Sequence, residues 1–116
     1  MTPEEHIDSV LQHLAGSRVF PDVAPEKTAT PYITYQAVGG APVNFLSGDQ
    51  PDKQPVRMQV NCWASTRIEA SELGAQVEQA MRAATELQVE VAAGRVATFD
   101  ETTNYRGTMQ DFSIWV

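Results

Sequence analysis

The chain has 116 residues, of which 42% are hydrophobic and 20% charged, values typical of one globular domain rather than of a disordered segment. Its 15 acidic and 8 basic residues give a net charge of −7, which disfavours binding to nucleic-acid phosphates or to an anionic membrane surface. The single cysteine allows no disulfide within the chain, the acidic start is not typical of a signal peptide, and no apolar run is long enough for a membrane span, so we expect synthesis in the cytoplasm.

The first predicted element is a helix over residues 3–15. Thr2 is a suitable N-cap, and Pro3 suits the first helical turn. The apolar residues recur at the spacing of one helical face, at Ile7, Val10, Leu11 and Leu14. The following segment, 18–31, contains three prolines and is predicted to be extended or looped.

Two strands and a long loop are predicted next. Aromatic and β-branched residues are dense over 32–38, which indicates a strand. Three glycines, three prolines and several polar residues then predict a flexible loop at about 39–55. The clearest alternation in the chain lies at 56–64, where every second residue is apolar, and it predicts a strand with one apolar face.

The second half of the chain predicts one helix and two further strands. Thr66 and Glu69 have the spacing of a capping box before a helix over 67–84. Strands are predicted over 87–99, interrupted near Gly94, and over 106–116. The expected fold is a single α+β domain spanning residues 1–116, with the order α-β-β-α-β-β. An antiparallel four-stranded sheet carries the two helices on one face.

The predicted core combines one face of each helix with the apolar side of the strands. Its members are Ile7, Val10, Leu11, Leu14, Ile33, Tyr35, Val56, Met58, Val60, Leu73, Val77, Met81, Phe112 and Ile114.

The sequence contains no pattern typical of a catalytic, cofactor or metal site. His6 and His13 lie seven residues apart, whereas a helical metal pair needs a spacing of three or four and further ligands. Cys62 lies on the apolar face of its strand, which predicts a buried and inert thiol. No glycine pattern for phosphate binding is present. We therefore expect no enzyme activity, no cofactor and no metal.

Eight residues are candidates for an interface between subunits. Two tryptophans, Trp63 and Trp115, fall on the strand face opposite the apolar positions, where a neighbouring subunit or a helix of the same chain would cover them. The others are strand cations and acids of the second helix that are able to pair between subunits: Arg57, Arg95, Arg106, Glu69, Glu72 and Glu78. Packing of the tryptophans within the chain and a solvated charged face remain alternatives.

The chain resembles the small tail-completion proteins of long-tailed phages and prophages, which include tail terminators and head–tail joining subunits. The resemblance begins at Val19-Phe20-Pro21 and at the Thr-Pro-Tyr-Ile-Thr-Tyr segment, 30–35. It continues through the strand at 56–64, which ends in Trp-Ala, and through the helix at 70–84. It closes with Arg106-Gly107 and with the terminal Asp-Phe-Ser-Ile-Trp-Val, 111–116.

This resemblance implies a structural subunit that performs no reaction. Such proteins form rings, typically hexameric, that cap the finished tail tube and meet the head connector. The implied partners are further copies of the chain, the tail tube protein and the head connector proteins, and DNA only as passing cargo. The subunit is expected as a monomer in dilute solution, first in the cytoplasm of the bacterial host and then in the virion tail.

The alternative function is a small cytosolic oligomeric enzyme or ligand-binding module with a site between subunits.

Overall fold

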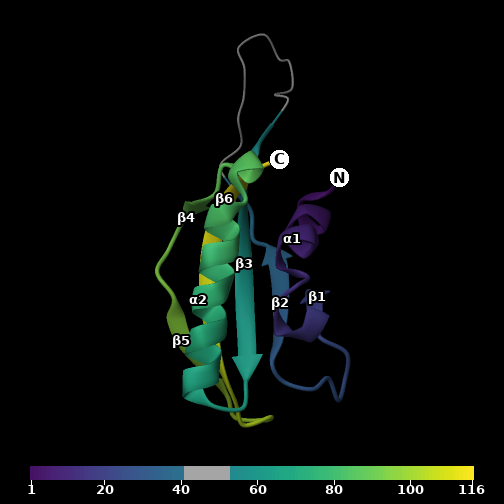
Figure 1. Cartoon of the computed structure of the whole chain (residues 1–116), viewed down its shortest axis with the longest axis vertical. Helices are drawn as coiled ribbons and strands as arrows, with labels where there is room; N and C mark the ends of the chain where they lie inside the picture. Colours follow the sequence, from purple (N-terminus) through teal and green to yellow (C-terminus); the bar gives the residue numbers. More distant parts are fainter. Residues whose placement is uncertain (41–52) are drawn as a thin grey trace.

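The computed structural model describes residues 1–40 and 53–116, which form two layers, a six-stranded sheet and two helices on one of its faces (Figure 1). The helices are α1, Pro3–Leu11, and α2, Arg67–Ala83, and short 3-10 turns follow at Ala15–Ser17 and Thr85–Leu87. The strands are β1 Val19–Pro21, β2 Tyr32–Ala37, β3 Pro55–Ala64, β4 Glu90–Val91, β5 Val96–Asp100 and β6 Tyr105–Trp115.

The sheet is mixed, with the strand order β1-β2-β3-β6-β4, and β5 also pairs with β6. β1 and β2 are parallel, whereas all other pairs are antiparallel. The α+β class and the placement of both helices on one face are confirmed. The prediction of four strands, all antiparallel, in the order α-β-β-α-β-β is wrong.

The first difference is β1, which lies in the segment that was predicted to be extended or looped. Val19 and Pro21 pair with Ile33 and Tyr35 of β2, so β1 lies at one edge of the sheet. Three residues are too few to show an alternation, and Pro21 lacks the N–H that a longer ladder would use. A strand of this kind forms because a neighbouring strand edge is available, which the sequence alone does not reveal.

The second difference is the strand predicted over 87–99, which is divided into β4 and β5. It starts late, because Leu87 belongs to a 3-10 turn and Gln88 follows at a positive φ of 50°. Residues 92–95 separate β4 from β5, while only residues 110 and 111 separate their partners on β6. The excess residues leave the ladder near Gly94, where the interruption was expected.

Both helices begin where the sequence predicts, but α1 ends early. Thr2 and Glu5 form a capping box at its start, with bonds of 3.1 and 3.2 Å. Leu14 is extended and residues 15–17 have positive φ, so the helix cannot continue to residue 15. Thr66 caps α2 by accepting a bond from the Glu69 backbone N–H.

The hydrophobic core lies between the helices and the sheet. Most of the predicted core is buried, namely Ile7, Leu11, Ile33, Tyr35, Met58, Val60, Leu73, Val77, Met81, Phe112 and Ile114. Val10, Leu14 and Val56 are partly buried and pack against this cluster. The flexible loop predicted at about 39–55 falls largely on residues 41–52, which lie outside the described residues.

Candidate interaction site on the open sheet face

The sheet has a second face, opposite the helices, which we call the open face. Strand alternation and register assign to it Tyr32, Thr34, Gln36, Arg57, Gln59, Asn61, Trp63, Tyr105, Met109, Asp111, Ser113 and Trp115. Most of these side chains are only partly buried, whereas their sequence neighbours on the helix side are buried. Within the described parts of the chain, both helices pack on the other side, so a surface rich in aromatic and polar groups is left accessible.

The two tryptophans lie at opposite ends of the open face, as the strand pattern predicts. Trp63 pairs with Tyr32 and Gly107, while Trp115 pairs with Pro55 at the far end of β3. A Cβ on Gly107 would lie 2.8 Å from Cε3 of Trp63. The indole of Trp63 therefore packs directly on the backbone of β6, and both tryptophans remain half-buried.

Arg57 also lies on the open face, away from the acids of α2. Its Nε donates to Oδ2 of Asp111 at 2.7 Å, across the β3–β6 pair. Glu69, Glu72 and Glu78 belong to α2, on the helix side of the sheet. The structure therefore separates Arg57 from these acids within one chain.

Two of the predicted interface residues are in contact within the chain. The Glu78 carboxylate accepts bonds from Arg95 at 3.0 Å, from Arg82 at 3.1 Å and from Gln110 at 2.8 Å. The pKa of Glu78 is lowered, chiefly by the bond from Gln110 and then by that from Arg82, although burial opposes this shift.

Arg106 lies on the helix side with its guanidinium 4.9 Å from the ring centroid of Phe99. The interface role of the eight candidates stays a prediction.

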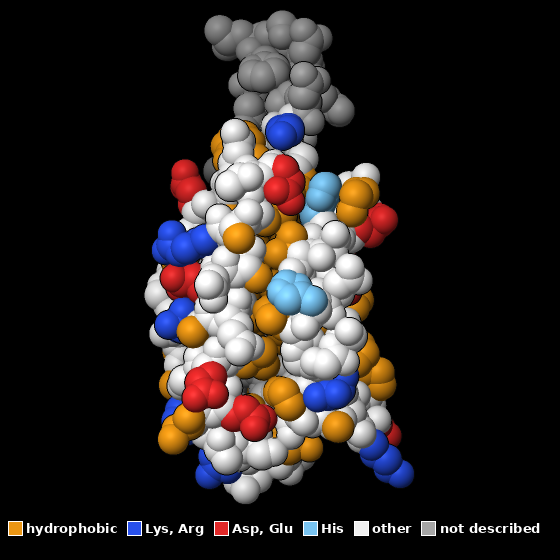
Figure 2. Space-filling view, in the orientation of Figure 1, with side chains coloured by type: hydrophobic (Ala, Val, Ile, Leu, Met, Phe, Trp, Pro, Cys, Tyr) orange, Lys and Arg blue, Asp and Glu red, His pale blue; other side chains and the backbone are white. Residues whose placement is uncertain are grey.

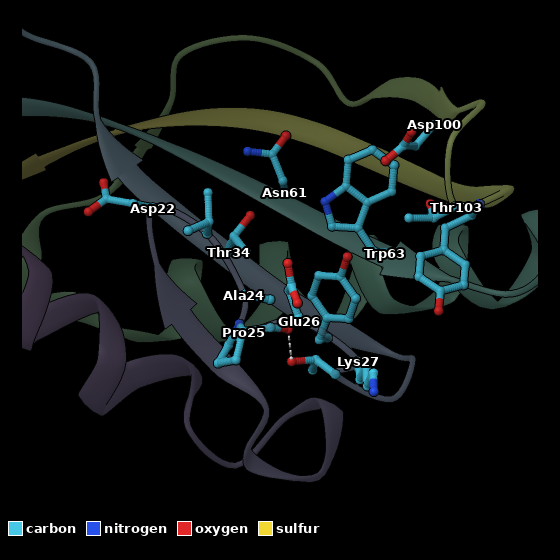
Figure 3. A pocket seen from close by; sticks show the side chains of 14 residues that line it. Asp22, Ala24, Pro25, Glu26, Lys27, Thr34, Asn61, Trp63, Asp100 and Thr103 are labelled. Atoms are coloured by element: carbon cyan, nitrogen blue, oxygen red, sulfur yellow. Dashed lines mark hydrogen bonds between the residues drawn. The ribbon is translucent and has the colours of Figure 1, made fainter.

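A pocket of about 630 Å³ lies at the Trp63 end of the open face, and no pattern in the sequence predicts it (Figure 3). The segment 22–28 and the β5–β6 turn form its walls, and strand residues form its floor. It is lined by Asp22, Val23, Ala24, Pro25, Glu26, Lys27, Thr28, Tyr32, Thr34, Asn61, Trp63, Asp100, Thr103 and Tyr105. Segment 22–28 has no periodicity that would predict which face of the sheet it covers.

The residues first considered for chemistry lie apart from this pocket. Cys62 is buried on the helix side, and burial raises the pKa of its thiol to about 11. On the helix-bearing surface, histidine side chains lie beside an apolar strip between α1 and α2 (Figure 2). In residues 1–40 and 53–116, no group of three or more His, Cys, Asp or Glu side chains is arranged to hold a metal ion. Over the same residues, no helix is both long and apolar enough to cross a membrane.

Comparison with known proteins identifies the family. The family described as "Tail completion protein gp17" matches residues 7–116, which is nearly the whole chain. No curated protein matches the chain. The family match includes every strand of the sheet and all of α2. The chain therefore belongs to the tail completion protein gp17 family, as a structural protein of a phage tail that associates with other tail components.

Proposed function

We propose that this protein is a single-domain subunit that forms a ring, with six copies, at the end of the tail tube. The ring terminates the tube and joins it to the head connector. Membership of the tail completion family is the observation that carries this proposal. It is supported by a sheet face and a sheet edge that residues 1–40 and 53–116 leave accessible.

The two edges of the sheet favour a head-to-tail contact between copies. At one edge, β5 exposes Val96 and Phe99, whose side chains are 50% and 49% accessible. Exposed strands of this kind tend to pair with another chain. At the other edge, β1 is short and ends in Pro21. Two unlike edges suit a heterologous contact, and such contacts close into a ring when the rotation between copies allows it.

The open face supplies the apolar anchors of the proposed interface. Trp63 or Trp115 of one copy would be covered by its neighbour, while Arg57 and Arg106 would pair with Glu69 and Glu72 of α2. An exposed ion pair contributes only about 0–1 kcal/mol, so the tryptophans are expected to dominate the contact. Arg95 and Glu78 would enter the interface as a pair already formed within one chain.

The net charge of −7 fits a ring through which DNA passes. Acidic groups that line the lumen would repel the phosphate backbone and reduce the time that DNA spends on the wall. In this proposal the free subunit is a monomer in the host cytoplasm. It closes into a ring only on the finished tail, where the tail tube protein and later the head connector contact it.

The proposal is tested by deleting the gene from an inducible phage and supplying variants in trans. We expect Trp115→Ala and Arg57→Glu to lower the yield of infectious particles, while Glu86→Gln, a change in the exposed 3-10 turn after α2, restores the parental yield. Each variant is first checked for a parental thermal melt. Parental yields from both folded open-face variants would show that the ring uses another surface. A compact dimer holding a small molecule would instead support the alternative, a binding module with a site between subunits.

A further inference from the structure

The pocket beside Trp63 has an aromatic floor. Tyr32 and Tyr105 pack edge to face, with ring centroids 6.3 Å apart and an interplanar angle of 77°. Trp63 pairs with Tyr32 across β2 and β3, and its indole rests on the backbone at Gly107. Three aromatic side chains from three strands therefore meet at one end of the open face (Figure 3).

The polar rim of the pocket is predominantly acidic. The carboxylates of Asp22, Glu26 and Asp100 line it, against the single ammonium group of Lys27. Within the described residues, none of these carboxylates forms a salt bridge. Burial is the main cause that raises the pKa of Tyr32, and the neighbouring Tyr105 and Asp100 raise it further. The excess of carboxylates at the rim favours a cationic ligand.

The walls of the pocket are held in place by the chain itself. The backbone N–H of Asp22 donates to the Tyr35 carbonyl at 2.8 Å, and Nε of Arg18 donates to the Pro31 carbonyl at 2.9 Å. On the opposite wall, the Asp100 carboxylate accepts the backbone N–H of Thr102 at 2.9 Å. A site that is already ordered loses less conformational entropy when a ligand binds.

We propose that this pocket binds the side chain of an arginine carried by a partner protein. A guanidinium is planar, so it can stack on an indole while its N–H groups donate to carboxylates. In Figure 3 the carboxylates of Glu26 and Asp100 lie on opposite sides of the Trp63 indole. Since both carboxylates line the same pocket as Trp63, an arginine placed over the indole would have acceptors within the pocket. The volume of about 630 Å³ also accommodates the residues that flank the arginine.

We expect the arginine from another head or tail protein, because each arginine of this chain has contacts within its own chain, and Arg57 and Arg106 are also assigned to the proposed contact with α2 of a neighbouring copy. Arg57, Arg82 and Arg95 form salt bridges within the chain. Arg18 and Arg67 donate to backbone carbonyls, and Arg106 combines such a bond with its contact to Phe99. Because the pocket belongs to a single chain, this inference does not depend on ring formation.

Tryptophan fluorescence gives a direct test. The chain has two tryptophans, so Trp115→Phe leaves Trp63 as the only reporter, and it lines the pocket. The probes are a capped pentapeptide with a central arginine between glycine and serine residues, and the same peptide with citrulline, which has nearly the same shape but no charge. The arginine peptide should give a saturable change in Trp63 fluorescence, with a Kd about tenfold lower than that of the citrulline peptide.

Variants of the rim locate the site. Glu26→Gln and Asp100→Asn, each in the Trp115→Phe background, should each raise the Kd of the arginine peptide several-fold. Glu86→Gln, an exposed carboxylate outside the pocket, should leave this Kd unchanged. Equal Kd values for the two peptides, or no fluorescence change with the arginine peptide, would overturn the proposal. A loss of binding in Glu86→Gln as large as in Glu26→Gln would also overturn it, because binding would then follow net charge alone.

Discussion

The carboxylate of Glu78 joins three parts of the chain. It accepts bonds from Arg82 in α2, from Arg95 before β5 and from Gln110 in β6. The nitrogen of the Gln110 side chain also donates to the Ala93 carbonyl at 3.2 Å, which holds the segment between β4 and β5. Glu78 thereby links the helix layer to the edge of the sheet.

Replacing Glu78 with Gln tests this link. The substitution removes the charge that pairs with both arginines, and we expect the free energy of unfolding to fall by about 1 kcal/mol. The folded pKa of Glu78 lies below the ordinary value of 4.5. The ionised carboxylate therefore contributes to the free energy of unfolding above pH 4.5, and this contribution is lost as the pH falls through the folded pKa. In urea unfolding, the difference between parent and Glu78→Gln should therefore shrink below pH 4.5. Glu86→Gln is the control, and an equal effect there would contradict this role.

Gly107 is required because three groups crowd its position. A Cβ there would lie 2.6 Å from Oγ1 of Thr98 and 2.8 Å from both the Cys62 carbonyl oxygen and Cε3 of Trp63. We expect Gly107→Ala to lower the free energy of unfolding by about 1–3 kcal/mol, the usual cost of overpacking. Gly94→Ala is the matched control, since a Cβ there meets no atom within 4 Å. Equal denaturation midpoints for the two variants would show that the strands separate without cost.

At the residue scale, the sequence predicts the sheet face on which a side chain lies better than it predicts the residue that the side chain contacts. The alternation around Trp63 and Trp115 assigns both to the face opposite the core, which is confirmed. Arg95 and Glu78, which are 17 residues apart, are in contact within one chain, a pairing that the sequence does not indicate, and their role between subunits stays a prediction. The pocket residues Asp22 and Glu26 lie in a segment without periodicity, so nothing in the sequence places them near Trp63.

At the scale of the elements, α2 provides much of the contact between helices and sheet. Leu73 lies on the buried face of α2 and is 5% exposed, whereas Ile68, five residues earlier and on the other face, is 72% exposed. We expect Leu73→Ala to cost about 2–5 kcal/mol of unfolding free energy, from lost burial and the cavity left behind. Ile68→Ala should change it by less than about 0.5 kcal/mol, as at other surface sites. Thermal or urea unfolding measures both, and similar losses for the two variants would contradict the observed orientation of α2.

The elements that the sequence predicts well are those with long periodic patterns. β3 and α2 are each within one residue of their expected bounds, because burial on one face imposes a pattern over their whole length. β1 is missed because it is three residues long. The interruption near Gly94 is predicted, but the late start of β4 is not, because residues 87–91 alternate as a strand would. In these cases the pairing partner, rather than local preference, determines the structure.

At the scale of the whole molecule, the two faces of the sheet have different roles. The helix face carries the core and the ion pairs of Glu78, which stabilise the fold. The open face carries both tryptophans, the pocket and the Arg57–Asp111 pair, and the helices leave it accessible. This division agrees with a tail protein that associates with other tail components.

The position of the protein in the virion tests the proposed function most directly. A peptide tag on the N-terminus, which precedes the residues matched by the family, allows gold labelling of particles from an inducible phage. Electron microscopy should show label only at the junction between head and tail. In tails without heads, it should show label at one end of the tube. Label along the whole tube, or only at the tip far from the head, would contradict a ring that terminates the tube and joins it to the head.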